Sequence, residues 1–78
     1  MVFESERYRY RWVSHVVENK IKEIREEQGI SRITLAKDAG VSYDTIRRLE
    51  NSSYVPTLLV AYDIAAALNK TIEEIFFF

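Results

Sequence analysis

The chain has 78 residues, of which 47% are hydrophobic and 29% are charged, and none is cysteine. This composition predicts one small folded domain that is stabilised by helix packing without disulfides and suits a reducing compartment. The sequence shows no signal-peptide pattern and no apolar stretch long enough to span a bilayer. We therefore expect a cytoplasmic protein that has no membrane partner.

The charge of the chain is close to balanced. Eleven basic and twelve acidic residues give a formal net charge of −1, whereas a nucleic-acid-binding chain is often clearly positive. The distribution is uneven, because residues 56–78 carry a net charge of −2 and residues 1–55 carry +1. A local basic face is therefore compatible with this composition.

The first twelve residues form a segment of their own, in which arginine alternates with aromatic residues from Arg7 to Trp12. Alternation with a period of two is typical of a β-strand. One hypothesis is a strand that pairs with Phe76–Phe78 or with its counterpart in a second subunit. A basic arm along DNA and a frayed terminus are the alternatives. We divide the chain into this arm or strand, residues 1–12, and a helical domain, residues 13–78.

The helical domain begins with a helix that we expect to start at Ser14. Gly29 is placed to end this helix in a left-handed conformation, and Ile30 would cap it hydrophobically. The apolar stripe of the helix is Val16, Val17, Ile21 and Ile24.

Two shorter helices follow, each with a serine as its N-cap. One runs from Ser31 to Ala39 and the next from Ser42 to about Glu50, with a sharp turn at Gly40. The spacing of their apolar residues predicts that the two helices cross and bury Ile33, Leu35, Ala36, Ala39, Val41, Ile46 and Leu49.

The last part of the chain predicts two further helices. Pro56 and Thr57 open a fourth helix that Asn69 can end in a left-handed conformation. Thr71 and Glu74 have the spacing of a capping box, which predicts a short fifth helix. The residues expected to face inward on the fourth helix are Leu58, Ala61, Ile64, Ala65 and Leu68. The fold class is therefore all-α, with five helices and a possible short N-terminal strand.

The helix over residues 43–50 exposes a polar face that can contact DNA. An arginine can donate two hydrogen bonds to guanine O6 and N7, which makes Arg48 and then Arg47 the main specificity candidates. Asp44 can accept from cytosine N4 or orient a neighbouring arginine. Tyr43 can pack on a thymine methyl group or donate to a phosphate.

The chain resembles the phage repressor and Cro type of helix-turn-helix regulators over residues 18–76. The resemblance rests on Arg25 before Gly29, Leu35-Ala36, Gly40-Val41-Ser42, Ile46, Leu49-Glu50-Asn51, Pro56, and Ile64-Ala65 to Leu68. It implies a five-helix bundle whose third helix enters the major groove, and a homodimer on a palindromic operator.

The resemblance also implies roles for individual residues. Tyr43, Asp44 and Arg48 match positions that contact bases, and Arg47 lies beside them. Arg25 and Glu50 match a structural salt bridge of the family. The positions expected to contact phosphate are Arg32, where the family usually has glutamine, and Ser42, Thr45, Asn51, Ser52 and Thr57.

We therefore predict a sequence-specific, double-stranded-DNA-binding transcriptional regulator, a repressor encoded by a bacterium or phage. A regulatory partner protein is compatible with so small a chain. The alternative is an interaction module, such as an antirepressor or a toxin-neutralising partner, that keeps the bundle without reading DNA. We expect no enzyme activity, metal or cofactor, because His15 lacks ligand partners and no base is placed beside a nucleophile.

Overall fold

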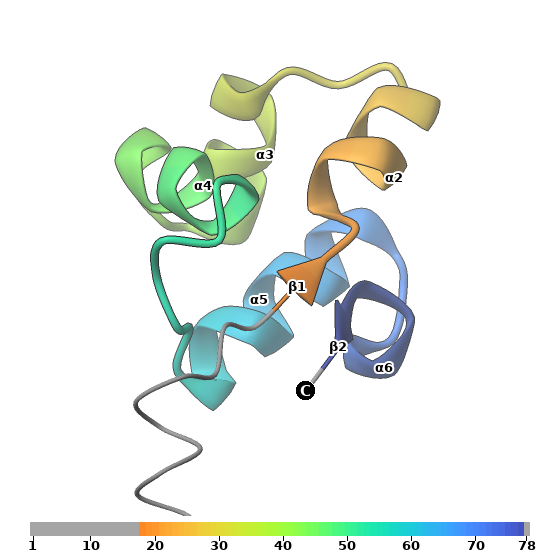
Figure 1. Cartoon of the computed structure of the whole chain (residues 1–78). Coiled ribbons are helices and arrows are strands. Elements are labelled where there is room, and N and C mark those ends of the chain that lie inside the picture. The colour runs from red at the N-terminus through yellow and green to blue at the C-terminus, as the bar shows by residue number, and fades with distance from the viewer. Residues whose placement is uncertain (1–17, 78) are drawn as a thin grey trace, which may run out of the picture.

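A computed structural model describes residues 18–77, which contain five helices and one two-stranded sheet (Figure 1). The helices wrap around one core, and the two strands lie side by side where the described chain begins and ends. This architecture confirms the all-α, repressor-like bundle. In chain order the elements are β1 (Glu18–Asn19), α2 (Ile21–Glu27), α3 (Arg32–Ala39), α4 (Tyr43–Glu50), α5 (Leu58–Leu68), α6 (Ile72–Ile75) and β2 (Phe76–Phe77).

Four of the helices begin at the hydroxyl caps that the sequence predicts. Each cap is extended, and its oxygen accepts a hydrogen bond from the backbone amide three residues on, which satisfies an otherwise unpaired donor. The capping box of α6 is complete, because the Glu74 carboxylate also accepts from the Thr71 backbone amide. The four N-caps are Ser31, Ser42, Thr57 and Thr71.

The ends of the helices use left-handed residues. Gly29 and Asn69 adopt positive φ angles after α2 and α5, as predicted. The amide of Ile30 then donates to the carbonyl of Arg25 at 3.1 Å, and the Ile30 side chain packs against the core. The sequence did not predict that Ser52, which follows α4, also has a positive φ of 57°.

The first helix starts later than the sequence predicts. The expectation of a helix from Ser14 is wrong at residues 18–20, because Glu18 and Asn19 pair antiparallel with Phe77 and Phe76. The amide of Lys20 donates to the carbonyl of Ile75, and the Asn19 side chain accepts from the amide of Ile21. The strand pairing and the bond from Lys20 to Ile75 are long-range, and they keep residues 18–20 out of a helix, so α2 begins only at Ile21.

The described partner of the Phe-rich end is therefore β1. The segment from Arg7 to Trp12, together with Val16 and Val17, lies outside the described residues. Its strand and arm hypotheses stay predictions.

The core consists of the inward faces of all five helices and Phe76. Its members are Ile21, Ile24, Leu35, Ala36, Ala39, Ile46, Leu49, Ala61, Ile64, Ala65, Leu68, Ile75 and Phe76, with Val41 partly buried against them.

Two expected core residues are exposed instead. Ile33 is 58% exposed because, two positions before Leu35, it projects from nearly the opposite side of α3. Leu58 is 77% exposed because it lies in the first turn of α5, beyond the edge of the core. Within residues 18–77, none of the helices has the length and apolar character that crossing a membrane requires.

Candidate nucleic-acid interface

The arrangement of α4 separates a buried face from an exposed polar face. Ile46 and Leu49 are buried against the core, while Tyr43, Asp44 and the two arginines on the opposite side face solvent. The hydroxyl cap of Ser42 and the turn at Gly40 orient α4 against α3. The structure thus gathers the four predicted base-contacting residues on one helix face.

The two arginines on this face lie around one carboxylate. Arg47 Nε donates to Asp44 Oδ1 at 2.9 Å, and Arg48 NH1 lies 4.0 Å from Asp44 Oδ2. All three side chains are about half exposed, at 45%, 48% and 58% for Arg47, Arg48 and Asp44. An exposed ion pair of this kind contributes little to stability, about 0–1 kcal/mol, so its members can exchange partners readily.

Arg48 has a second neighbour that the sequence analysis missed. Its guanidinium lies over the Tyr54 ring, 5.3 Å from the ring centroid, and Tyr54 packs against the core. This cation–π contact holds Arg48 beside the loop that follows α4. Tyr54 lies six residues after Arg48 and outside α4, so helical spacing does not predict this contact.

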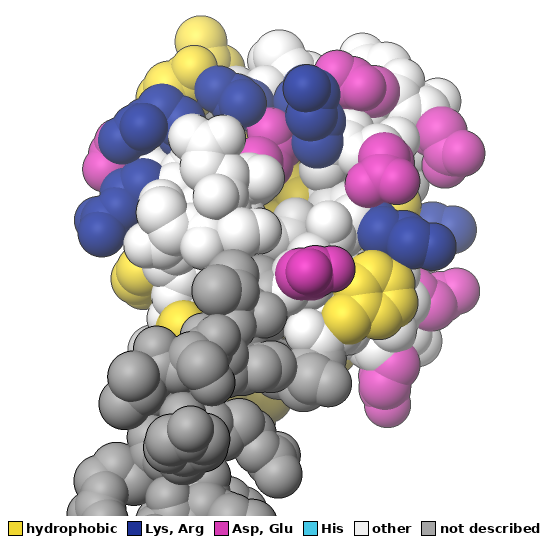
Figure 2. Space-filling model, viewed as in Figure 1, with side chains coloured by type: hydrophobic (Ala, Val, Ile, Leu, Met, Phe, Trp, Pro, Cys, Tyr) yellow, Lys and Arg dark blue, Asp and Glu magenta, His cyan; other side chains and the backbone are white. Residues whose placement is uncertain are grey.

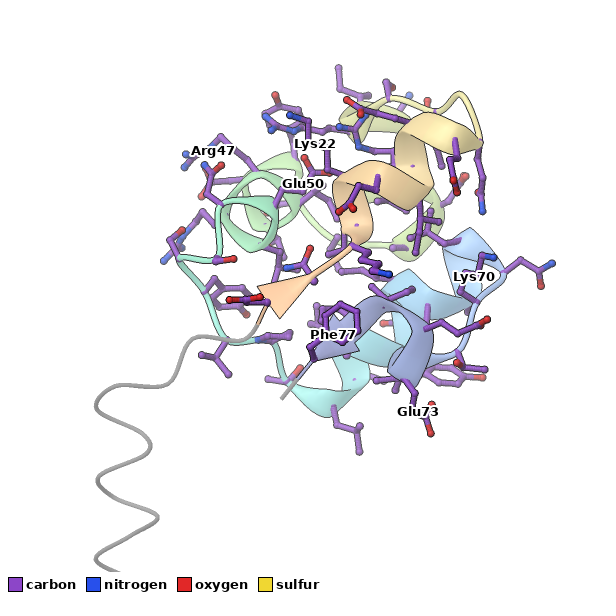
Figure 3. All side chains as sticks on the ribbon, turned by 45° about the vertical axis from the view of Figure 1, so that its right-hand side comes forward. Lys22, Arg47, Glu50, Lys70, Glu73 and Phe77 are labelled. Carbon is purple, nitrogen blue, oxygen red and sulfur yellow. The ribbon has the colours of Figure 1, made fainter. Side chains whose placement is uncertain are left out.

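At the other end of α4, Glu50 forms a buried ion-pair network. Its side chain is only 1% exposed, and its carboxylate accepts from Arg25 Nε at 2.8 Å and from Arg32 Nε at 2.9 Å. Arg25 also donates to the carbonyl of Ile30. The network therefore joins α2, α3 and α4 and fixes the position of the exposed face. In Figure 3, Glu50 lies between α4 and α2, while Arg47 projects outward.

Arg32 was expected to contact phosphate, and the structure gives it a structural partner as well. Hydrogen bonds to Tyr43 and to Glu50 raise the pKa of its guanidinium, which keeps it charged. Its side chain is still partly exposed. One part of the group can therefore stabilise the bundle while another part faces solvent beside Tyr43.

The remaining phosphate candidates lie at the ends of helices. The oxygens of Ser42 and Thr57 accept backbone amides as N-caps, and Ser42 and Thr45 share a hydrogen bond between their hydroxyl groups at 2.8 Å. One of these two hydroxyl groups therefore already donates its proton to the other, and the second hydroxyl proton is left to donate elsewhere. Asn51 and Ser52 lie just after α4, and Asn51 is exposed. These positions border α4 on both sides.

The charge of the described surface is segregated. In the view of Figure 2, most Lys and Arg side chains lie at the upper left over α3 and α4, and Asp and Glu predominate on the right. The exposed Lys22 on α2 lies at the same end as Arg47 in Figure 3. A chain with a net charge of −1 therefore still presents a basic side, so its overall charge does not argue against nucleic-acid binding.

A family model described as helix-turn-helix matches residues 21–75. The chain belongs to this helix-turn-helix family. The match confirms the resemblance to repressor and Cro-type regulators, and it covers every helix of the described chain.

Relatives of this family member are named as regulators. An uncharacterised helix-turn-helix transcriptional regulator of Archaeoglobus fulgidus is 42% identical over 59 residues, which are 76% of this chain and 84% of that protein. The regulator YgzD of Bacillus subtilis, likewise uncharacterised, is 37% identical over 60 residues, which are 77% and 91% of the two chains.

A solved structure has the same arrangement of helices. The crystal structure of the restriction-modification controller protein C.AhdI from Aeromonas hydrophila matches with a TM-score of 0.68 and 25% identity, over 70% of this chain and 83% of that one. Together with the named relatives, it favours DNA binding over a bundle used only for protein contacts. This helix-turn-helix protein is a DNA-binding transcriptional regulator.

Proposed function

We propose that this regulator inserts α4 into the major groove and reads base edges with the exposed face of that helix. The observation that carries the proposal is the pair of half-exposed arginines, Arg47 and Arg48, on a helix whose other side is locked into the core. An α-helix fits the major groove, where an arginine can donate two hydrogen bonds to guanine.

The side chains of α4 have separable roles in this proposal. Arg48, held by Tyr54, contacts guanine, and Arg47 contacts a base or the adjacent backbone after leaving Asp44. Asp44 then accepts from cytosine N4 or keeps one arginine aligned. Tyr43 is placed at the first position of the helix to contact a thymine methyl group or a phosphate.

Phosphate contacts on both sides of α4 fix its register on the duplex. Arg32, Ser42 and Thr45 supply donors before and within the first turn, and Asn51, Ser52 and Thr57 supply donors after the helix. Such contacts make affinity strongly salt-dependent.

We further propose that the protein acts as a homodimer on a palindromic operator and represses by occupying promoter DNA in the cytoplasm of a bacterium or of a phage host. A single α4 covers only a few base pairs, whereas two copies related by a two-fold axis read two half-sites one helical turn apart. Protein concentration or a partner protein would then control occupancy.

The test begins with selection of bound sequences from a random duplex pool. The selected palindrome is then titrated with the native protein, Arg48→Ala and Lys70→Ala at several salt concentrations. Losing one bidentate contact to guanine costs about 1–3 kcal/mol, so Arg48→Ala should weaken binding by roughly 5- to 150-fold without lowering Tm.

Lys70→Ala is the matched control, because it also removes one positive charge but lies away from Arg47 in Figure 3. Its affinity should stay within about twofold of the native protein. Equal affinity of Arg48→Ala and the native protein would overturn the reading role of α4.

A further inference from the structure

The two arginines on the exposed face of α4 are held in different ways. Arg47 donates to Asp44 Oδ1 through both Nε and NH2, so a carboxylate already engages its guanidinium. Arg48 NH1 lies 4.0 Å from Asp44 Oδ2, which is too far for a hydrogen bond. Among the described residues, no hydrogen bond engages the Arg48 guanidinium, which lies over the Tyr54 ring at 5.3 Å from the centroid.

The kind of contact decides which donors remain for DNA. The N–H donors of a guanidinium lie in its plane and point outward from its edges. Ion pairing with Asp44 occupies donors of Arg47, which has to leave this carboxylate before it contacts a base. A cation–π contact is an attraction between the charge and the ring, and it requires none of these donors. Arg48 is therefore held in place with its donors free for guanine O6 and N7.

The loop after α4 brings Tyr54 to this position. Ser52 turns the chain with a φ of 57°, a left-handed conformation that is uncommon for a residue with a side chain. Its amide donates to the Leu49 carbonyl, while the amide and the hydroxyl of Ser53 donate to the Arg48 carbonyl at 2.9 and 3.1 Å. The loop thus folds back along the last turn of α4. Ser53 fixes the backbone of Arg48, and Tyr54 contacts its side chain.

The Tyr54 ring has a firm support on its other side. The residue is partly buried and packs against the core, whereas the Arg48 side chain is 48% exposed. A free arginine has many rotamers, and fixing one of them when DNA binds costs free energy. A ring that is held by the core restricts Arg48 before DNA arrives and so reduces this cost.

We propose that Tyr54 is a positioning residue that makes Arg48 the guanine-reading arginine of α4. The inference rests on the proposed DNA-reading role of α4. It deepens that role by assigning the choice between Arg47 and Arg48 to a residue outside the helix. Tyr54 acts through Arg48 and contacts no base itself. Two chains with the same α4 but different residues at position 54 will therefore differ in their preference for guanine.

The test first identifies the guanine that Arg48 contacts. Each guanine of the selected palindrome is replaced in turn by 7-deazaguanine, which lacks the N7 acceptor of the bidentate contact. The position sought is the one where this replacement weakens binding of the native protein but not of Arg48→Ala. At this position the native protein should lose about fivefold or more in affinity.

Three substitutions of Tyr54 then separate the ring from its surroundings. Tyr54→Leu and Tyr54→Met remove the ring but keep an apolar side chain against the core, and Tyr54→Phe keeps the ring. Without the ring, affinity for the palindrome should fall about 2- to 12-fold, and the loss with 7-deazaguanine should shrink below about twofold. Tyr54→Phe should restore both native values, because the ring alone makes the contact.

Two readouts distinguish positioning from support of the fold. Affinity for a scrambled duplex and its salt dependence should stay native in Tyr54→Leu and Tyr54→Met, because the phosphate contacts remain. Tm is measured for every variant. If the ring only supported the fold, affinity would fall by the same factor on the natural and the 7-deazaguanine duplex, and this outcome would overturn the proposal.

Tyr62→Leu is the matched control, because it makes the same change at an exposed tyrosine that lines a groove between α5 and α6. Its affinity for the palindrome and its response to 7-deazaguanine should stay within about twofold of the native protein. Equal responses of Tyr62→Leu and Tyr54→Leu would show that the effect does not depend on contact with Arg48.

A double substitution tests whether Tyr54 acts through Arg48. In the Arg48→Ala background, Tyr54→Leu should cause no further loss of affinity for the palindrome, because the group that it positions is absent. Additive losses would overturn the proposal.

Failure of the reading role gives a different result. In that case Arg48→Ala would bind the palindrome as the native protein does, and no guanine would depend on it. If α4 reads DNA but Tyr54 does not position Arg48, then Arg48→Ala would weaken binding while Tyr54→Leu and Tyr54→Phe would bind equally well. The two proposals are therefore separated by different variants.

Discussion

Helix α4 carries two arginine–carboxylate clusters, one near each end, and they differ in burial. Asp44 in the first turn binds Arg47 and lies near Arg48, with its side chain 58% exposed. Glu50 at the last residue of the helix binds Arg25 and Arg32, with its side chain 1% exposed. Both clusters pair a carboxylate of α4 with guanidinium groups, but the arginines of the first are on α4 itself and those of the second come from α2 and α3.

Burial gives these clusters different consequences. A buried carboxylate has lost its water, so it depends on its arginines, and each arginine depends on it. An exposed carboxylate can replace either arginine with water at little cost, which leaves the arginine available for DNA. The comparison teaches that the surroundings of an ion pair, more than its members, decide whether it stabilises the fold or serves binding.

The largest expected effect is loss of the buried cluster. Glu50→Ala removes the shared acceptor of Arg25 and Arg32 and leaves two guanidinium groups without their partner. Breaking a buried ion pair in this way costs about 3–5 kcal/mol. We expect a loss of this size in the free energy of unfolding, measured by urea denaturation and circular dichroism.

Asp44→Ala is the control for that experiment, because it removes the exposed carboxylate of the same helix. It should change the free energy of unfolding by no more than about 1 kcal/mol. Equal losses in the two variants would show that burial does not distinguish the clusters.

The exposed cluster should instead affect DNA selectivity. Asp44→Asn keeps the shape of the side chain but releases Arg47 from its ion pair. Since an exposed pair is worth about 0.2–1 kcal/mol, affinity for a scrambled duplex should rise about 1.5- to 5-fold. Affinity for the selected palindrome should not rise by the same factor, so the ratio of the two affinities falls. A proportional rise for both duplexes would argue against a discriminating role of Asp44.

A third carboxylate gives the smallest expected effect and sharpens the comparison. Glu74 is exposed yet structural, because it accepts from the backbone amide and then the hydroxyl of Thr71 in the capping box. These hydrogen bonds lower the pKa of Glu74 below its ordinary value of 4.5. As pH falls, the Glu74 carboxylate is therefore protonated at a higher pH in the unfolded chain than in the folded one. The stability that Glu74 contributes is lost as pH falls through the folded-state pKa.

Thermal melts of the native protein and of Glu74→Gln from about pH 6 to about pH 3 measure this loss. The Tm advantage of the native protein should shrink toward the acid end. A constant difference between the two proteins across this range would contradict the assignment.

Local sequence rules predicted most of the helix ends. Ser31, Ser42, Thr57 and Thr71 cap helices because a hydroxyl can reach an unpaired amide from within the same few residues. The exposed face of α4 followed equally from helical spacing. These features depend only on neighbours along the chain.

The wrong predictions have long-range causes. The start of α2 depends on Phe76 and Phe77, which are almost sixty residues away from β1. Leu58 fits a helical stripe but lies beyond the edge of the core that the other helices form. The contact of Arg32 with Glu50 and that of Arg48 with Tyr54 depend on how segments pack together.

The sequence by itself determined the number of helices in residues 18–77, the N-caps of α3, α4, α5 and α6, the helix-turn-helix family and the polar face of α4. Only the tertiary structure decided which carboxylate is buried, where α2 begins, and that Leu58 is left exposed. The reason is that caps and helical periodicity act over three or four residues. Burial, by contrast, is a property of a position in the folded chain, because it depends on every segment that packs around it.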